Sequence, residues 1–246
     1  MRDARRPLIS HGRQLRDPFA DRASLLCRTL LANPGTVWHV RGLAEAAGVA
    51  PMLSSDVVRQ LESAGIVTAQ ARGRQLLVRL IDPQALLEKW TAIYRYTRSA
   101  ALHFAAAGPT MDKWPQRLAQ AAGARRWALT LLAGAWQRNR YAPTERLHIY
   151  VECEDIQELR SVADRAGWPE DAAGSLVLMK PAYRTSTWHQ ISNARPDGPP
   201  VVSDLQLILD LWHYPERGRE TAEQLWRPIL RLFERASATE ESAHGE

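Results

Sequence analysis

Apolar positions near the N-terminus recur with a helical period and predict three helices in succession. The first covers residues 21–33, the second 40–47 and the third 51–65. Pro51 suits the first turn of the third helix, because a proline there gives up no helical hydrogen bond. Residues 48–50 form a short glycine-containing corner between the second and third helices, which is what a helix-turn-helix requires.

After residue 65 the period of the apolar positions changes to two. Runs at 66–71 and 75–81 therefore predict two β-strands, and the glycine-containing turn between them has the length of a hairpin. An amphipathic helix is expected from about 85 to 96. The order helix, helix, turn, helix, hairpin is that of a winged helix-turn-helix. We assign this domain to residues 19–98, with a basic flexible arm over residues 1–18 before it.

The second half of the chain predicts a mixed α/β domain over residues 99–236. Its expected helices cover 100–107, 113–122, 124–138, 155–166, 203–213 and 219–235, and its expected strands cover 147–151 and 176–180. Ser203 can cap the fifth of these helices. Residues 237–246 are polar and acidic and predict a disordered tail. The predicted fold class is therefore α+β, with two domains.

Composition excludes several classes of protein. A hydrophobic content of 45% with 24% charged residues is that of a globular chain, not of a disordered or fibrous one. The longest apolar stretch, 127–136, is far shorter than the roughly 20 residues that cross a bilayer. No apolar core follows the N-terminal arginines, so no secretory signal is expected, and two cysteines suit a reducing compartment. A cytoplasmic location without membrane contact is predicted.

Charge separates the two halves. Residues 1–98 hold 15 Lys and Arg against 8 Asp and Glu, a balance of +7, whereas residues 99–246 hold 17 against 19. A polyanion such as DNA attracts a basic surface largely independently of its sequence. The N-terminal half is therefore the one expected to contact double-stranded DNA.

The candidate DNA contacts are one side chain of the second helix, those on the outward face of the third helix, and those at the tip of the hairpin. Serine can bond to base edges or phosphates, and arginine can form two parallel hydrogen bonds to guanine or phosphate. The candidates are Arg41, Met52, Ser54, Ser55, Arg59, Arg72 and Arg74. Met52 and the adjacent Asp56 are unusual in a dense groove contact. Winged helices also act as dimerisation modules without nucleic acid, and that alternative stays open.

Residues 132–152 resemble the layout of a nucleotidyltransferase site, where two carboxylates on one strand hold Mg²⁺. Here Arg146 and His148 occupy the corresponding alternate positions, and neither supplies a carboxylate. Glu152, Glu154 and Asp155 lie just beyond, and the acidic start of a helix explains them more simply. We therefore predict no catalytic residues, no metal site and no cofactor.

The C-terminal third contains the run VVSDLQLILDLWHYPERGRETAEQLW, residues 201–226. This run resembles the AbiEi-type antitoxins of type IV toxin–antitoxin systems, and the similarity covers roughly residues 120–230. The positions that match the family pattern are Val202, Ser203, Gln206, Leu209, Asp210, Leu211, Pro215, Arg217, Gly218, Glu220 and Ala222. Thr221 departs from the usual alanine, and the segments 127–135 and 148–151 resemble the same domain.

This resemblance implies a DNA-binding winged helix followed by a nucleotidyltransferase-like domain without activity. It also implies a repressor of its own operon, whose cognate toxin is a separate nucleotidyltransferase that the antitoxin opposes without necessarily binding it. We expect a homodimer on an inverted repeat. The alternative is a ligand- or nucleotide-responsive regulator with its site in the C-terminal domain and no toxin partner.

Overall fold

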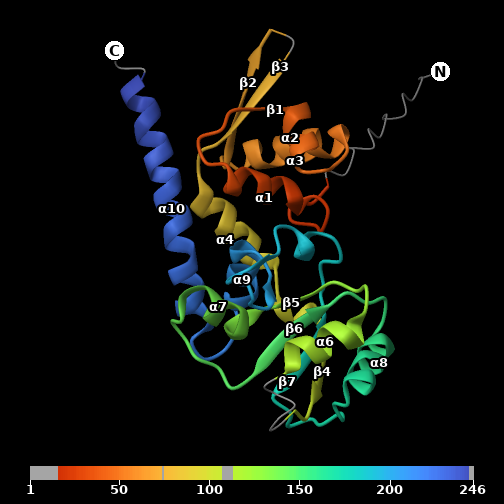
Figure 1. Cartoon of the computed structure of the whole chain (residues 1–246). Coiled ribbons are helices and arrows are strands. Elements are labelled where there is room, and N and C mark those ends of the chain that lie inside the picture. The colour runs from red at the N-terminus through yellow and green to blue at the C-terminus, as the bar shows by residue number, and fades with distance from the viewer. Residues whose placement is uncertain (1–15, 74, 107–112, 244–246) are drawn as a thin grey trace, which may run out of the picture.

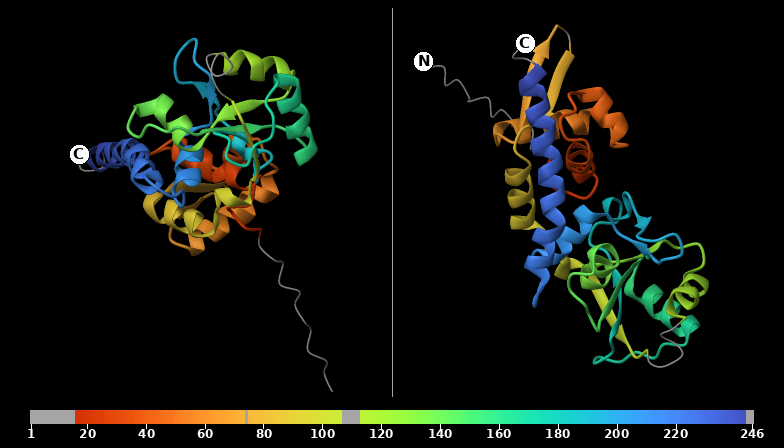
Figure 2. Two further views of the ribbon diagram at one scale, coloured as in Figure 1. Left: turned by 90° about the horizontal axis from the view of Figure 1, so that it is seen from below. Right: turned by 60° about the vertical axis from the view of Figure 1, so that its left-hand side comes forward.

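A computed structural model describes residues 16–73, 75–106 and 113–243, which fold into an α+β structure with a three-stranded and a six-stranded sheet (Figure 1). The smaller sheet lies at one end of the molecule and the larger sheet at the other. Helix α10 (Gly218–Ala243) runs beside α4 (Pro83–Ile93) toward the end with the smaller sheet, as the right-hand view of Figure 2 also shows. None of the helices in the described ranges has the length and apolar character needed to cross a bilayer.

The N-terminal part contains the predicted helices and hairpin. These elements are α1 (Ser24–Ala32), α2 (Val40–Ala46), α3 (Pro51–Ser63), β2 (Val67–Arg72) and β3 (Gln75–Leu80). A two-residue strand that the sequence did not reveal, β1 (Trp38–His39), pairs antiparallel with β3 and leads directly into α2. The sheet order β1-β3-β2 therefore ties the hairpin to the start of the second helix.

The corner between α2 and α3 depends on Gly48, whose φ of 63° is left-handed. The N–H of Val49 donates to the carbonyl of Ala44 at 2.9 Å, and the N–H of Gly48 donates to the carbonyl of Glu45 at 3.0 Å. These two bonds form a Schellman motif, which satisfies the last carbonyls of a helix while it turns the chain sharply. The predicted glycine corner is thus present.

The C-terminal part is built on the six-stranded sheet, whose order is β4-β7-β6-β5-β9-β8. Its strands are β4 (Ala100–Phe104), β5 (Trp127–Leu129), β6 (Leu147–Val151), β7 (Leu176–Lys180), β8 (Ser192–Asn193) and β9 (Pro200–Val201). Its helices, besides α10, are α6 (Trp114–Ala122), α7 (Leu131–Asn139), α8 (Ile156–Ala166) and α9 (Asp204–Leu211). The pairs β6–β7 and β5–β9 are parallel and the other pairs are antiparallel.

Three predictions for this part are wrong. Residues 100–104 form strand β4 instead of a helix, because they pair with β7 along their whole length; residue 107 of that predicted helix lies outside the described residues. The helix predicted over 124–138 divides into β5 and α7, with Thr130 between them. The tail predicted to be disordered from residue 237 continues α10 as far as Ala243. Most of the predicted arm, residues 1–15, lies outside the described range.

Buried polar side chains join the two parts of the chain. The Gln206 side chain in α9 accepts a hydrogen bond from the Arg28 guanidinium of α1 at 2.6 Å and donates to the Tyr94 hydroxyl at 2.9 Å. Tyr94, which follows α4, donates in turn to the Asp210 carboxylate at 2.6 Å. These four side chains are almost fully buried, so the N-terminal helices and α9 share one polar network inside the core. We call these four residues the junction network.

Asp210 accepts two further hydrogen bonds from the larger sheet and its flank. Thr130 donates to one carboxylate oxygen at 2.5 Å, and Tyr150 donates to the other at 3.1 Å. Burial nevertheless raises the pKa of Asp210 to about 6, because the charged form loses its hydration. Burial and the nearby carboxylate likewise raise the pKa of Tyr94 and Tyr150. Asp210 is therefore the point where the N-terminal helices, α9 and the larger sheet meet.

Candidate nucleic-acid interface

An open groove of about 1130 Å³ runs between α2, α3 and the start of β3. Four of the seven predicted DNA contacts line this groove: Arg41, Met52, Ser55 and Arg59. Arg41 comes from the first turn of α2, and the other three come from successive turns of α3. The three residues of α3 face the groove because the apolar stripe of this helix packs inward and leaves the opposite side to solvent.

Met52 and Arg59 are both largely exposed in this groove. Met52 is 64% exposed, which is unusual for a large apolar residue. The Arg59 side chain is 58% exposed, and its guanidinium lies 3.5 Å from the carboxylate of Asp56, which is buried one turn earlier in α3. Asp56 thus anchors one end of the guanidinium beside the groove. The Ser55 hydroxyl donates to the carbonyl of Pro51 at 3.1 Å on the exposed side.

Ser54 does not belong to this surface. We predicted it on the outward face of the third helix, but its side chain is fully buried. Its hydroxyl donates to the carbonyl of Val40 at 3.1 Å, at the start of α2. The hydrogen bond links α2 to α3, and a small polar residue fits there because the two helices cross closely at the corner. Ser54 therefore stabilises the fold and does not face solvent.

The tip of the hairpin carries Arg72, which is exposed at the end of β2. Gly73 follows with a φ of 61°, which lets the chain reverse between Arg72 and Gln75. Arg74, the other predicted contact at the tip, lies outside the described residues.

The groove also contains residues that sequence reasoning missed. His39, Gln75 and Leu76 line it from the smaller sheet. His39 belongs to the two-residue strand β1, which is too short to produce a periodic signal. Gln75 and Leu76 were recognised as the start of a strand, but nothing in the sequence indicated that this strand faces α3.

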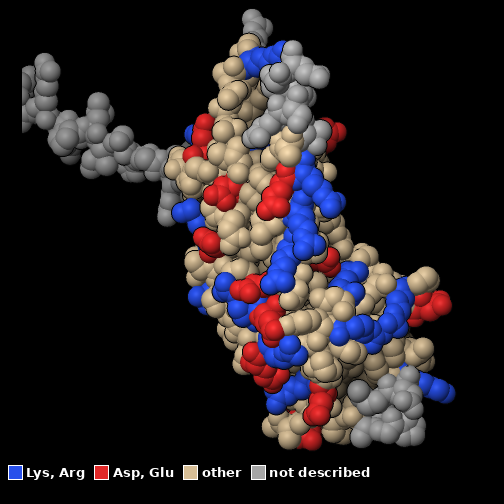
Figure 3. All heavy atoms as spheres, turned by 90° about the vertical axis from the view of Figure 1, so that its left-hand side faces the viewer, with Lys and Arg blue, Asp and Glu red and all other residues tan. Residues whose placement is uncertain are grey.

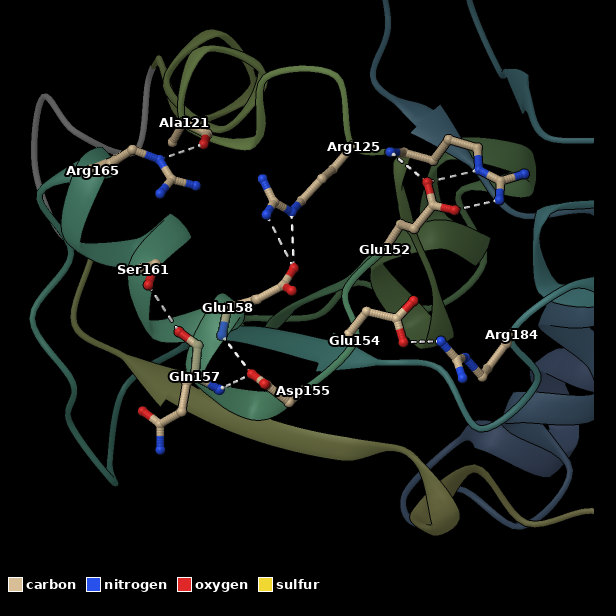
Figure 4. A network of polar contacts seen from close by, with 11 residues as sticks. Ala121, Arg125, Glu152, Glu154, Asp155, Gln157, Glu158, Ser161, Arg165 and Arg184 are labelled. Atoms are coloured by element: carbon tan, nitrogen blue, oxygen red, sulfur yellow. Dashed lines mark hydrogen bonds and ion pairs between the residues drawn. The ribbon is translucent and has the colours of Figure 1, made fainter.

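The acidic residues after β6 have basic or structural partners (Figure 4). The guanidinium of Arg126 donates to both carboxylate oxygens of Glu152, at 3.0 and 2.5 Å, and this contact lowers the pKa of Glu152. Glu154 pairs with Arg184. Asp155 accepts the first free N–H groups of α8, at 2.9 and 3.1 Å, which confirms its assignment to a helix start.

The position corresponding to a carboxylate on this strand holds a neutral side chain. His148 is buried on β6, and burial together with the charges of Arg146 and His103 lowers its pKa to about 4. Across residues 16–73, 75–106 and 113–243, no three His, Cys, Asp or Glu side chains are grouped as metal ligands. Because Glu152 and Glu154 are already paired to arginines, they offer a divalent cation little free negative charge.

The face that α10 presents to solvent carries a band of basic side chains (Figure 3). Arg227, Arg231 and Arg235 are spaced four residues apart on this helix and are exposed. Their spacing places them on one side of the helix. The basic surface of the molecule therefore extends beyond the N-terminal part, to which the charge count had assigned it.

A family model described as "Transcriptional regulator, AbiEi antitoxin, Type IV TA system" matches residues 79–230, more than half of the chain. The match begins in β3 and ends in α10, so it includes the junction residues Tyr94, Gln206 and Asp210 but none of the residues that line the groove. No curated protein and no solved structure matches the chain. The chain belongs to the AbiEi antitoxin family, the transcriptional regulators of type IV toxin–antitoxin systems.

Proposed function

We propose that this protein is the autoregulating antitoxin of a type IV toxin–antitoxin system and that it represses its own operon in the cytoplasm by binding duplex operator DNA. Residues 19–98 act as a winged helix-turn-helix, with α3 in the major groove and the β2–β3 hairpin as the wing. One observation carries this proposal. Arg41, Met52, Ser55 and Arg59, which come from two helices, line a single open groove beside the hairpin.

The groove side chains suit different parts of a DNA duplex. Arg59 has the reach and the paired donors to contact a guanine edge or a phosphate. Met52 offers an exposed apolar surface of the kind that contacts the methyl group of thymine. Arg41 at the start of α2, together with Arg72 and Arg74 of the hairpin turn, would neutralise phosphates. Base discrimination then depends on few side chains, and phosphate contacts supply much of the affinity.

We further propose that the protein binds an inverted repeat as a homodimer and that residues 99–236 form a nucleotidyltransferase-like domain without activity. The toxin would be a nucleotidyltransferase, and this domain would oppose it but would not itself transfer nucleotides. The pairing of Glu152 with Arg126 and of Glu154 with Arg184 supports this, because a nucleotide transfer that uses Mg²⁺ needs carboxylates free to bind the metal.

The DNA-binding proposal is tested by fluorescence anisotropy with a labelled duplex from upstream of the protein's own operon and a scrambled duplex of equal length. The purified full chain is expected to bind the upstream duplex more tightly. Arg41→Ala and Arg59→Ala should each weaken that binding, whereas Arg160→Ala, which removes a half-buried arginine of α8 that pairs with Glu170, should not. Equal affinity for both duplexes, or equal losses in all three variants, would refute the assignment of the groove.

The absence of activity is tested by incubating the protein with labelled nucleoside triphosphates, Mg²⁺ or Mn²⁺, and tRNA or protein acceptors. No transfer of label is expected. A double variant, Glu152→Ala with Glu154→Ala, serves as the control. If the protein transfers label and the double variant does not, these glutamates are catalytic and the proposal of an inactive domain is wrong.

A further inference from the structure

A pocket of about 290 Å³ opens where α1, α7, α9 and α10 meet, next to the junction network. It lies apart from the DNA-binding groove, and no residue lines both. Its volume is close to the lower limit of about 300 Å³ for ordinary small-molecule pockets. Two arginines, Arg28 and Arg138, line it together with Asp204. The formal charge of these lining side chains is therefore positive.

Arg28 is an unusual residue for the interior of a protein. It is only 2% exposed, and its guanidinium donates to two neutral acceptors, the side chains of Gln206 at 2.6 Å and Ser203 at 3.4 Å. Its Nε has no hydrogen-bond partner within the described part of the chain, and no carboxylate there lies within 4 Å as a salt-bridge partner. The guanidinium also lies 5.3 Å from the centre of the Trp90 ring, and the Asp210 carboxylate attracts it from beyond salt-bridge distance. A buried cation without a directly paired carboxylate costs free energy, and a bound anion would reduce that cost.

Two neighbours of Arg28 strengthen the attraction for an anion. Helix α9 begins at the pocket, because its cap Ser203 and its first residues, Asp204 and Leu205, all line it. The N-terminus of a helix carries a partial positive charge and free N–H groups. Arg138 is held at the rim by Asp204 at 3.1 Å and by the hydroxyl of Ser192 at 3.0 Å, so its guanidinium is fixed in place while Asp204 offsets part of its charge.

Apart from Gln190 and Ser192, the remaining wall of the pocket is apolar, and it comes from both parts of the chain. Leu31 and Pro34 belong to the N-terminal part, and Ile229 and Leu232 belong to α10. Leu232 is 55% exposed, which leaves apolar surface for the carbon skeleton of a ligand to cover. A ligand in this position would contact the end of α1, the start of α9 and the side of α10 together.

We propose that this pocket binds a small organic anion, with a phosphate or carboxylate group between Arg28 and Arg138 and an apolar portion against Leu232. Because the bound anion contacts helices of both parts, it stiffens the junction and changes the affinity of the groove for DNA. The binding step is independent of the proposed function, and only its effect on DNA rests on that function.

Binding is tested by thermal unfolding of the full chain in inorganic phosphate and in malonate, each compared with chloride at equal ionic strength. An anion at ten times its Kd is expected to raise Tm by roughly 3–6 °C. Phosphate also stabilises proteins in general by its exclusion from their surface, so the informative quantity is the difference between variants. Arg227→Met, which removes an exposed arginine from α10, should keep the full shift.

Two variants should each abolish the part of the Tm increase that comes from anion binding in the pocket. Arg28→Met removes the buried charge and keeps a side chain of similar length. Ala32→Glu places a carboxylate at the exposed pocket rim, and Ala32→Gln is its neutral match. Loss of the shift in Ala32→Glu, with retention in Arg227→Met, supports the site even if Arg28→Met fails to fold. If Ala32→Glu and Arg227→Met respond to both anions alike, the pocket is not an anion site.

The effect on DNA is measured separately, as the Kd for the operator duplex with and without saturating anion at constant ionic strength. A change of at least about threefold that disappears in Ala32→Glu is expected, since coupling between sites is commonly of this size or larger. A thermal shift without a change in Kd would keep the binding site and refute the coupling. If phosphate weakens binding of the duplex to Ala32→Glu as much as it weakens binding to the wild type, phosphate competes with DNA at the groove and does not act through this pocket.

Discussion

The groove and the junction network use polar side chains in opposite ways. In the groove, the Arg59 side chain is 58% exposed and forms an ion pair with Asp56. In the junction, Gln206 and Asp210 are completely buried, and each takes part in at least three hydrogen bonds. The family match covers Gln206 and Asp210 but not the groove. The α9 residues within the family match thus join the two parts of the chain, while the candidate contacts to DNA lie outside the match.

The largest effect is expected at the centre of the junction, in Asp210→Ala. This change leaves Thr130, Tyr94 and Tyr150 without their shared acceptor inside the core. Loss of one partner from a buried charged network costs about 3–5 kcal/mol. We expect that loss in the free energy of unfolding, measured by urea titration.

Two controls make this prediction specific. Asp210→Asn keeps one oxygen for the two tyrosines and can donate to Thr130, so it should cost much less. Asp204→Ala removes an aspartate from the same helix whose side chain is 53% exposed, and its effect should be small. If Asp210→Ala were no more damaging than Asp204→Ala, the network would not be what joins the two parts.

The pH dependence of stability should contain two opposing contributions of similar size. The folded pKa of Asp210, about 6, lies above the ordinary aspartate value of 3.8, so the folded state binds the proton more tightly. Its contribution to stability therefore falls by about 3 kcal/mol as pH rises from 3.8 to 6. His148 has a folded pKa of about 4 against the ordinary histidine value of 6.5, and its contribution rises by about 3 kcal/mol between pH 4 and 6.5.

Each contribution can be isolated by a substitution that does not titrate. Relative to the wild type, Asp210→Asn should lose stability as pH is lowered from about 6.5 to about 4, because only the His148 contribution remains. His148→Phe should gain stability over the same range. Urea titrations at half-unit intervals of pH measure both slopes, and parallel curves for the wild type and Asp210→Asn would show that Asp210 does not titrate in this range.

Sequence reasoning recovered the local structure of the N-terminal part because its signals are local. The helical stripe of α3 and the glycine at the corner with α2 lie within a few residues of the structure they determine. The strand Ala100–Phe104 was mistaken for a helix because its alanines favour helices, whereas its actual state is set by pairing with β7, about 75 residues away. Partners that distant leave no trace in a short window.

The same distinction explains which functional residues were found. Met52 and Arg59 could be assigned to the outward face of α3 from helical period alone. The bond from Arg28 to Gln206 spans 178 positions and could not be inferred that way. Gln206 and Asp210 were noticed only as matches to the family pattern, without a role. The prediction that Ser54 faces outward is wrong because Ser54 lies at the border of the apolar stripe of α3. At such a position, packing against α2 determines whether the side chain is buried.

In the groove, smaller effects are expected, and they concern binding to DNA instead of folding. Arg59→Ala should cost about 1–3 kcal/mol of binding free energy on the operator and less on random DNA.

A double variant, Arg72→Ala with Arg74→Ala, should weaken binding to every sequence alike and reduce the salt dependence by about one unit for each phosphate that is no longer neutralised. Anisotropy titrations at several salt concentrations measure both quantities. An unchanged salt slope in the double variant would remove the hairpin tip from the interface.

The smallest effects are expected from two adjacent serines of α3. One serves stability through a buried hydrogen bond, and the other is a candidate contact to DNA. Ser54→Ala removes a buried hydrogen bond to the Val40 carbonyl and should lower stability by about 1 kcal/mol. Its affinity for the operator, measured under conditions where the variant is folded, should stay that of the wild type. Ser55→Ala should leave stability nearly unchanged, because its hydroxyl lies on the exposed side of α3, and should weaken operator binding. The reverse outcome, with Ser54 needed for DNA and Ser55 for stability, would mean that α3 is rotated about its axis and presents a different face to the groove.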